Sequence, residues 1–181
     1  MRNSISILTF AFFLACTSQE DKKSTVAEFS DSSAMTNRRS ERFFPEKKKT
    51  EIFDTLIADR QVKISIKKTY LDSYVSNEYE DEGYKQVDKY RDAEITLIIK
   101  QNSEILLDTV LRKEQFSNYA DQEFMDIAIF HNYWFKKLDK DKIELFGVIS
   151  KPETDYSLAF YHYFDLANRK LEFVEYIEEE E

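Results

Sequence analysis

Residues 143–177 read IELFGVISKPETDYSLAFYHYFDLANRKLEFVEYI, and this stretch decides the fold. It contains three β-prone runs, in which apolar and polar side chains tend to alternate, separated by the five-residue turns KPETD and DLANR. The runs cover residues 143–150, 156–164 and 170–177. Because short turns join neighbouring antiparallel strands, the stretch predicts an antiparallel meander.

The segment before this meander carries further strand patterns. Residues 62–70 alternate between apolar and polar side chains, which predicts a strand with one face in water. The apolar runs 93–100 and 104–111 flank the tripeptide QNS, whose Asn tolerates a left-handed turn, so we expect a hairpin. Residues 52–57 fit either a strand or a helix, and we favour a strand. Residues 127–135 fit a strand that is apolar on both sides or a short helix.

Two polar segments interrupt these runs. Residues 113–124 leave room for a helical turn, whereas residues 76–91 carry an acidic cluster before the turn-permissive Gly83 and predict a surface loop. The acidic cluster comprises Glu78, Glu80, Asp81 and Glu82. Its carboxylates suit Ca²⁺, but they lack the regular spacing of an EF-hand, so we favour a solvated loop.

Taken together, the patterns predict a mainly β fold of about eight strands. The strands form an antiparallel sandwich or a strongly curved, closed sheet, with little helix outside the N-terminal segment. A hydrophobic fraction of 42%, with 15 Phe and 11 Tyr, supplies the material for a core. Two glycines in the whole chain exclude glycine-rich linkers and most phosphate-binding loops.

The N-terminus, MRNSISILTFAFFLAC, has the pattern of a signal peptide over residues 1–15. Arg2 precedes an apolar run of about ten residues, which is too short for a membrane span of about 20. The end of this segment, Leu14-Ala15-Cys16, resembles a bacterial lipobox. The resemblance implies that Cys16 becomes the first residue and carries palmitate-type acyl chains, which would make the lipid bilayer a partner. An ordinary secretory signal that is cut near Ala15 is the alternative.

These assignments divide the chain into three parts. Residues 1–15 form the signal peptide, residues 16–49 a lipidated N-terminus with a flexible tether, and residues 50–181 a β-rich globular domain. Residues 17–49 carry eight Lys and Arg against six Asp and Glu, whereas residues 50–181 carry 17 against 29. So acidic a domain repels the phosphate backbone, which excludes nucleic acid as a partner. The only cysteine is Cys16, so no disulfide can form within the chain.

A wider resemblance rests on four features of the chain. The charged segment 19–23 (QEDKK) is similar to the export signal of surface-exposed lipoproteins of Bacteroidetes. With the lipobox, the PETD turn at 152–155 and the aromatic strand 156–164, the chain resembles small uncharacterised Bacteroidetes lipoproteins that hold a domain of unknown function. The resemblance implies a cell-envelope protein of the outer membrane, which either faces the periplasm or is exposed on the surface. It supplies no catalytic residues.

The sequence offers few candidates for chemistry. His131 and His162 fall in separate predicted strands, without the i, i+4 helical spacing of a zinc protease, and we expect both to be half-exposed beside tyrosines. No serine lies in a nucleophile elbow. We therefore expect no catalytic residue, no metal and no cofactor, and we favour a non-enzymatic protein over an envelope hydrolase with an unrecognised site.

The aromatic side chains of the C-terminal half are the remaining candidates for a ligand site. The candidate ligand-binding residues are Tyr133, Trp134, Tyr161 and Tyr163. Aromatic faces bury a large area, and tyrosine hydroxyls still form hydrogen bonds, which suits sugar rings or peptide side chains. Packing in the core is the favoured alternative, and we expect Trp134 to be buried. The sequence thus indicates a membrane-anchored binding or assembly module for an envelope protein or glycan.

Overall fold

The computed structural model describes residues 39–176 of the chain. The predicted signal peptide (1–15), the candidate lipidation site Cys16 and the predicted tether up to residue 38 lie outside the described residues. Within the described part, no helix combines the length and the apolar character that a membrane span requires.

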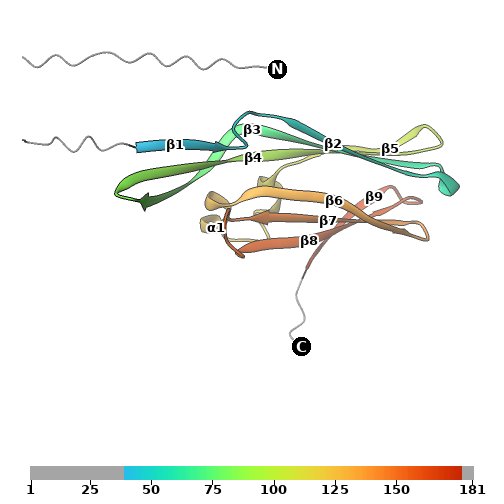
Figure 1. Ribbon diagram of the computed structural model, residues 1–181. Coiled ribbons are helices and arrows are strands. Elements are labelled where there is room, and N and C mark those ends of the chain that lie inside the picture. Colours follow the sequence, from blue (N-terminus) through green and yellow to red (C-terminus); the bar gives the residue numbers. More distant parts are fainter. Residues whose placement is uncertain (1–38, 177–181) are drawn as a thin grey trace, which may run out of the picture. The chain divides into compact units, whose positions relative to one another are not determined.

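Between residues 39 and 176, nine strands form two sheets that stack as layers (Figure 1). The first sheet contains β1 (Arg39–Phe44), β2 (Thr50–Ile57), β3 (Val62–Asp81), β4 (Tyr84–Gln101) and β5 (Glu104–Leu111). The second contains β6 (Ile129–Asp139), β7 (Lys142–Ser150), β8 (Ser157–Asp165) and β9 (Lys170–Glu175). Short helices are η1 (Ala58–Arg60), η2 (Lys113–Phe116) and α1 (Gln122–Ile127). Strand accounts for 69% and helix for 9% of the residues that the structure describes, which confirms the predicted mainly β sandwich.

The second sheet is the predicted meander, in the order β6-β7-β8-β9, with every neighbouring pair antiparallel. In the first sheet, β4 is the central strand. Strand β3 follows one edge of β4, while β1 and β5 share the other edge. β1 runs parallel along Lys85–Tyr90, and β5 runs antiparallel along Ile95–Gln101. On this edge, the β4 residues between these two contacts have no strand partner within the described part of the chain.

The core lies between the two sheets. From the first sheet it takes alternate residues of β3 and β4, in pairs such as Ile64 with Ile99 and Ile66 with Leu97. From the second sheet it takes Phe160 and its inward-facing neighbours, which are fully buried. Gly147 is required here, because a Cβ at this position would lie 2.2 Å from the Phe160 ring. These contacts follow from the alternation of β-strands, which sends every second side chain into the core.

Asp92 joins the two sheets inside the protein. This residue falls in the part of β4 between its contacts with β1 and β5, and it is 3% exposed. Its carboxylate accepts the backbone N–H of Phe130 on β6 at 2.8 Å and that of Ala93 at 2.8 Å. Lys113 lies 3.5 Å from the same carboxylate and donates to the carbonyls of Met125 and Ala128. The buried charge therefore has partners on every side, as a buried ion requires.

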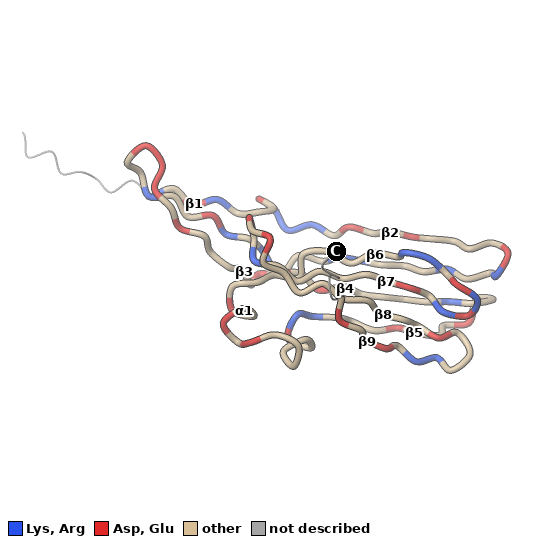
Figure 2. The backbone as a smooth tube through the Cα atoms, turned by 90° about the horizontal axis from the view of Figure 1, so that it is seen from below, with Lys and Arg blue, Asp and Glu red and all other residues tan. Residues whose placement is uncertain are grey.

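The predicted loop at 76–91 is wrong. Strands β3 and β4 run straight through it as a paired hairpin, which turns at Glu82 and Gly83, both with positive φ. The β4 half buries Asp88 as well as Val87 and Tyr90. In the β3 half, side chains 76–81 are exposed on both faces, so no apolar pattern marks the strand. Cross-strand ion pairs replace it, such as Lys85 to Glu78 at 2.6 Å. The acidic cluster lies at the tip of this hairpin (Figure 2).

Residues 39–44 also differ from the sequence analysis, which placed them in the tether. They form β1, whose Arg42 donates two hydrogen bonds of 2.8 Å to the buried carboxylate of Asp88. A single strand that pairs in parallel with a distant partner leaves no local signal in a sequence. The other assignments are confirmed: residues 50–57 form a strand, 93–111 a hairpin and 113–127 two short helices. The ambiguous segment 127–135 contains the end of α1 and the start of β6.

Candidate functional site

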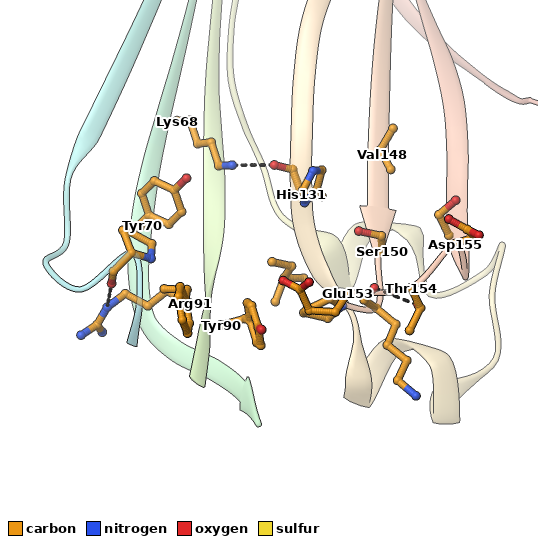
Figure 3. A pocket seen from close by; sticks show the side chains of 16 residues that line it. Lys68, Tyr70, Tyr90, Arg91, His131, Val148, Ser150, Glu153, Thr154 and Asp155 are labelled. Atoms are coloured by element: carbon orange, nitrogen blue, oxygen red, sulfur yellow. Dashed lines mark hydrogen bonds between the residues drawn. The ribbon is translucent and has the colours of Figure 1, made fainter. Parts of the chain in front are cut away.

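A cleft of about 830 Å³ opens between the two sheets at the end where β3 and β4 pass β6 (Figure 3). One wall comes from the first sheet, with Lys68 and Tyr70 on β3 and Tyr90 on β4. The other wall comes from β6, β7 and the turn that follows β7. It includes His131, Ser150 and residues 151–155. The cleft therefore combines basic, hydroxyl and aromatic groups from segments that are far apart in the sequence.

Lys68 is the most buried basic group of the cleft, with a residue exposure of 9%. Its ammonium donates a 2.5 Å hydrogen bond across the cleft to the backbone carbonyl of His131 (Figure 3). It also lies 4.7 Å from the centroid of the Tyr70 ring, within the range of a cation–π contact. Among the described residues, no carboxylate forms an ion pair with Lys68.

His131 faces Lys68 from an irregularity in β6, where the pairing with β7 shifts between Phe130 and Asn132. Such a bulge reorients a side chain that the regular pleat would place elsewhere. Burial and the positive charge of Lys68 both lower the pKa of His131. The imidazole is therefore neutral at neutral pH and acts as a hydrogen-bonding group rather than a charge.

The turn after β7 closes the far side of the cleft. Thr154 stabilises this turn, because the Thr154 hydroxyl donates to the carbonyl of Lys151 at 3.1 Å and accepts the N–H of Tyr156 at 3.2 Å. Glu153 adopts a positive φ of 60° in this turn. Burial, followed by the negative charge of Glu153, raises the pKa of Tyr90 to about 12. Tyr90 thus stays neutral, and its ring stacks on Phe44 with 5.1 Å between centroids.

Arg91 is the second basic residue at the first-sheet wall. Its Nε donates to the carbonyl of Pro45 at 3.3 Å, and its guanidinium lies 4.3 Å from the centroid of the Phe43 ring. Arg91 therefore holds the segment after β1 against β4, which shapes the rim of the cleft.

A second candidate surface is the outward face of the second sheet, where aromatic side chains form a continuous row. The aromatic row consists of Trp134, Phe146, Tyr161, Tyr163 and Tyr176. The ring centroids of Trp134 and Phe146 are 4.9 Å apart, and those of Phe146 and Tyr161 are 4.8 Å apart. The register explains the row, because Trp134, Phe146 and Tyr161 lie side by side on β6, β7 and β8.

Three of the four predicted ligand-binding residues belong to the aromatic row: Trp134, Tyr161 and Tyr163. Each is half-buried, so Trp134 packs against its neighbours but keeps contact with solvent, unlike the full burial we expected. The fourth residue, Tyr133, points to the opposite face and is 2% exposed. Adjacent strand residues face opposite sides, so Tyr133 and Trp134 could not share a surface. Ligand binding at the row stays a prediction.

His162 lies in the core, and the expectation of a half-exposed histidine is wrong for this residue. It faces inward from β8, is 5% exposed and contacts the rings of Phe116, Phe160 and Phe173. Its Nδ1 is 2.9 Å from the hydroxyl of Tyr133. Burial lowers the pKa of His162 to about 4, which keeps the ring neutral. His131, by contrast, is partly accessible at the cleft, as expected.

Within residues 39–176, these positions do not assemble a recognisable catalytic centre. The hydrogen-bond partner of His162 is a tyrosine, and no described hydrogen bond joins the His131 side chain to a serine or a carboxylate. The described residues also contain no group of three or more His, Cys, Asp or Glu side chains that could hold a metal. In the acidic hairpin tip, Glu78 pairs with Lys85 instead of converging on its acidic neighbours.

The comparison with known families identifies a domain that covers most of the described residues. A family model described as a domain of unknown function, DUF4738, matches residues 27–165. The chain belongs to this family. The DUF4738 match includes every residue of the cleft and most of the aromatic row, and it begins before β1. None of the curated proteins matches the chain.

Sequence reasoning missed the cleft residues of this DUF4738 domain, although one signal was present. Lys68 follows Val62, Ile64 and Ile66 at the same two-residue spacing and therefore occupies the inward-facing register of β3. A lysine in such a register is uncommon, because burying its charge is costly. The contributions of Ser150 and the 151–155 turn depend on how the two sheets meet, which no local pattern reveals.

Proposed function

We propose that the chain is a lipoprotein of the bacterial cell envelope, anchored in the outer membrane through acylated Cys16, and that its β-sandwich binds an envelope protein or glycan. The sequence Leu14-Ala15-Cys16 and the preceding apolar run support the anchor. A single acyl chain binds a membrane only marginally, so stable anchoring rests on the two or three chains that a lipobox cysteine carries.

The aromatic row is the observation that carries the binding role. Soluble proteins seldom place many large aromatic side chains together on an outward sheet face without a partner for them. At the end of this row, Tyr176 is 42% exposed and the neighbouring Val174 is 47% exposed. The flat rings suit stacking against sugar rings or peptide side chains, and the tyrosine hydroxyls supply hydrogen bonds.

Lys136 adds a polar element to the same face. Its ammonium lies 5.6 Å from the centroid of Phe146 and 6.0 Å from that of Tyr161. A cation above aromatic rings is attracted to their faces, and its N–H groups can donate to a ligand oxygen. The row therefore combines apolar area with polar groups, as recognition sites do.

Anchoring is tested by metabolic labelling with a clickable fatty acid in the native envelope. The wild-type chain takes up the label and fractionates with membranes, whereas Cys16→Ser loses the label and becomes soluble. Equal labelling of the two chains would contradict the anchor.

Binding is tested by retention of the full-length Cys16→Ser chain on purified envelope glycan and, separately, on immobilised envelope proteins. Trp134→Ala and Tyr161→Ala should each weaken retention about tenfold or more on one of the two supports, as expected for aromatic hot spots. Tyr84→Ala is the matched control, because Tyr84 is an exposed aromatic residue outside the row. Unchanged retention of both row variants on both supports would refute the binding surface.

A further inference from the structure

Lys68 on β3 and Lys113 on η2 both bury most of their side chains, and they differ in how their ammonium groups are satisfied. The Lys113 ammonium donates hydrogen bonds to the carbonyls of Met125 and Ala128, and it forms an ion pair with the carboxylate of Asp92 at 3.5 Å. The Lys68 ammonium has one hydrogen-bond acceptor among the described residues, the carbonyl of His131. An ammonium has three donors, so Lys68 uses only one of them within the described part of the protein, whereas Lys113 has two hydrogen bonds and an ion pair.

The spare donors of Lys68 border open space, because Lys68 lines the cleft. An incompletely paired charge at 9% exposure is expensive unless something in the cavity accepts its hydrogen bonds. A cleft of about 830 Å³ has room for a ligand of moderate size as well as water. Figure 3 shows Lys68 extending from β3 across the cleft to the wall formed by β6.

The charges around Lys68 favour an acceptor with a single negative charge. Three basic and two acidic side chains line the cleft, which leaves one net positive charge when His131 is neutral. The acidic pair, Glu153 and Asp155, both lie in the turn after β7. A dianion such as phosphate would be repelled by this pair, whereas a carboxylate beside Lys68 would form a charge-assisted hydrogen bond.

The remaining walls indicate the body of the ligand. Tyr70 lies beneath the ammonium, and Tyr90 stacks on Phe44 at the rim. Ile129 and Val148 add apolar surface from the second sheet, and Ser150 adds a hydroxyl. These groups suit a flat or apolar body with few polar atoms.

We propose that the cleft binds a small organic monoanion, whose carboxylate pairs with Lys68 and whose ring or apolar body packs between Tyr70, Tyr90 and Ile129. This site is separate from the aromatic row, whose residues do not line the cleft. The proposal for the cleft and the proposal for the aromatic row can therefore be tested and refuted independently.

The test uses benzoate as the probe and benzamide, its neutral counterpart of the same shape. Both are titrated into the full chain carrying Cys16→Ser, and the backbone amide resonances are followed by NMR. We expect benzoate to shift the resonances of Lys68, His131 and Ser150 saturably, with a dissociation constant of roughly millimolar or tighter. Benzamide should bind about tenfold more weakly or not at all, because it lacks the charge.

Variants assign the effect to Lys68. Lys68→Met keeps the length of the side chain but removes its charge, and it should abolish the benzoate shifts. Lys67→Met is the matched control, because Lys67 is exposed on the opposite face of β3, and it should leave them unchanged. Equal binding of benzoate and benzamide, undiminished benzoate binding to Lys68→Met, or no saturable shift at tens of millimolar benzoate would each overturn the proposal. The first and third of these outcomes need no variant to fold.

Discussion

The space between the two sheets is filled in one region and open in another. In the filled region the rings of Phe116, Phe130 and Phe160 pack together, with 4.5 Å between the centroids of Phe116 and Phe160. In the open region Lys68 and His131 face each other across the cleft. The difference arises within one strand, because β3 presents apolar side chains to the core until Ile66 and then presents Lys68.

The filled region and the open region contribute differently to the protein. Aromatic packing in the filled region excludes water, and it stabilises the fold because it removes apolar area from water. The open region gives up that stabilisation and keeps a charged group that the protein only partly satisfies. Stability should therefore be sensitive to substitutions in the first region, and ligand binding to substitutions in the second.

The largest effect is expected for Phe160→Ala in the filled region. The Phe160 ring is fully buried and contacts Phe116, Phe130 and Phe173, so its removal leaves a cavity. We expect a loss of about 3–5 kcal/mol in the free energy of unfolding, measured by urea denaturation. Phe44→Ala at the rim of the cleft is the comparison, and it should cost about 1 kcal/mol, because Phe44 is 40% exposed. Equal losses would show that the rim is as tightly packed as the core.

The second prediction concerns the pH dependence of stability in the filled region. The pKa of His162 is about 4 in the folded protein, against 6.5 for a histidine that is not buried. As the pH falls, the unfolded chain therefore binds this proton before the folded protein does. The free energy of unfolding should therefore fall as the pH drops from about 6.5 to 4, by up to about 3 kcal/mol from this residue. Denaturation curves at several pH values measure the slope.

Substitutions separate the two histidines in this experiment. His162→Gln keeps an acceptor for the Tyr133 hydroxyl and should flatten most of the slope between pH 6.5 and 4. His131→Gln in the open region should leave most of it in place, since the His131 ring is more accessible. A slope that survives in His162→Gln would place its origin elsewhere.

A much smaller loss of stability than that of Phe160→Ala is expected for Trp134→Ala in the aromatic row. Trp134 is half-buried against Phe146, so its removal loses a packing contact without leaving an enclosed cavity. We expect a loss of about 1 kcal/mol, which a thermal melt detects as a shift of a few degrees. A loss as large as that of Phe160→Ala would mean that the row is part of the core rather than a surface for a ligand.

The sequence predicts the strands that bury one face in the core, and it does not predict the strand segments without a buried apolar face. Strands β7, β8 and β9 alternate between core and surface, so their order and pairing follow from the pattern. The outer part of β3 is exposed on both faces and is held to β4 by ion pairs, so its sequence resembles a loop. Strand β1 depends on a parallel partner more than 40 residues away.

The two candidate surfaces differ in the same way. Strand alternation alone separates Tyr133 from Trp134, and it places Tyr161 and Tyr163 on one face. The cleft requires knowledge of how β6 and the turn after β7 approach the first sheet, which arises from tertiary packing. Only Lys68 was accessible to sequence reasoning, as a charge in an apolar register.

The most direct test of the division between a stabilising region and a binding region compares the two buried lysines by thermal melts. Lys113→Met removes the ion-pair partner of the buried Asp92 carboxylate and should cost about 3 kcal/mol or more, because breaking a buried pair leaves the other group uncompensated. Lys68→Met removes an incompletely paired charge and should leave the melting temperature unchanged or raise it. If Lys68→Met lowers the melting temperature as far as Lys113→Met does, then Lys68 is a structural residue and the account of the open region is wrong.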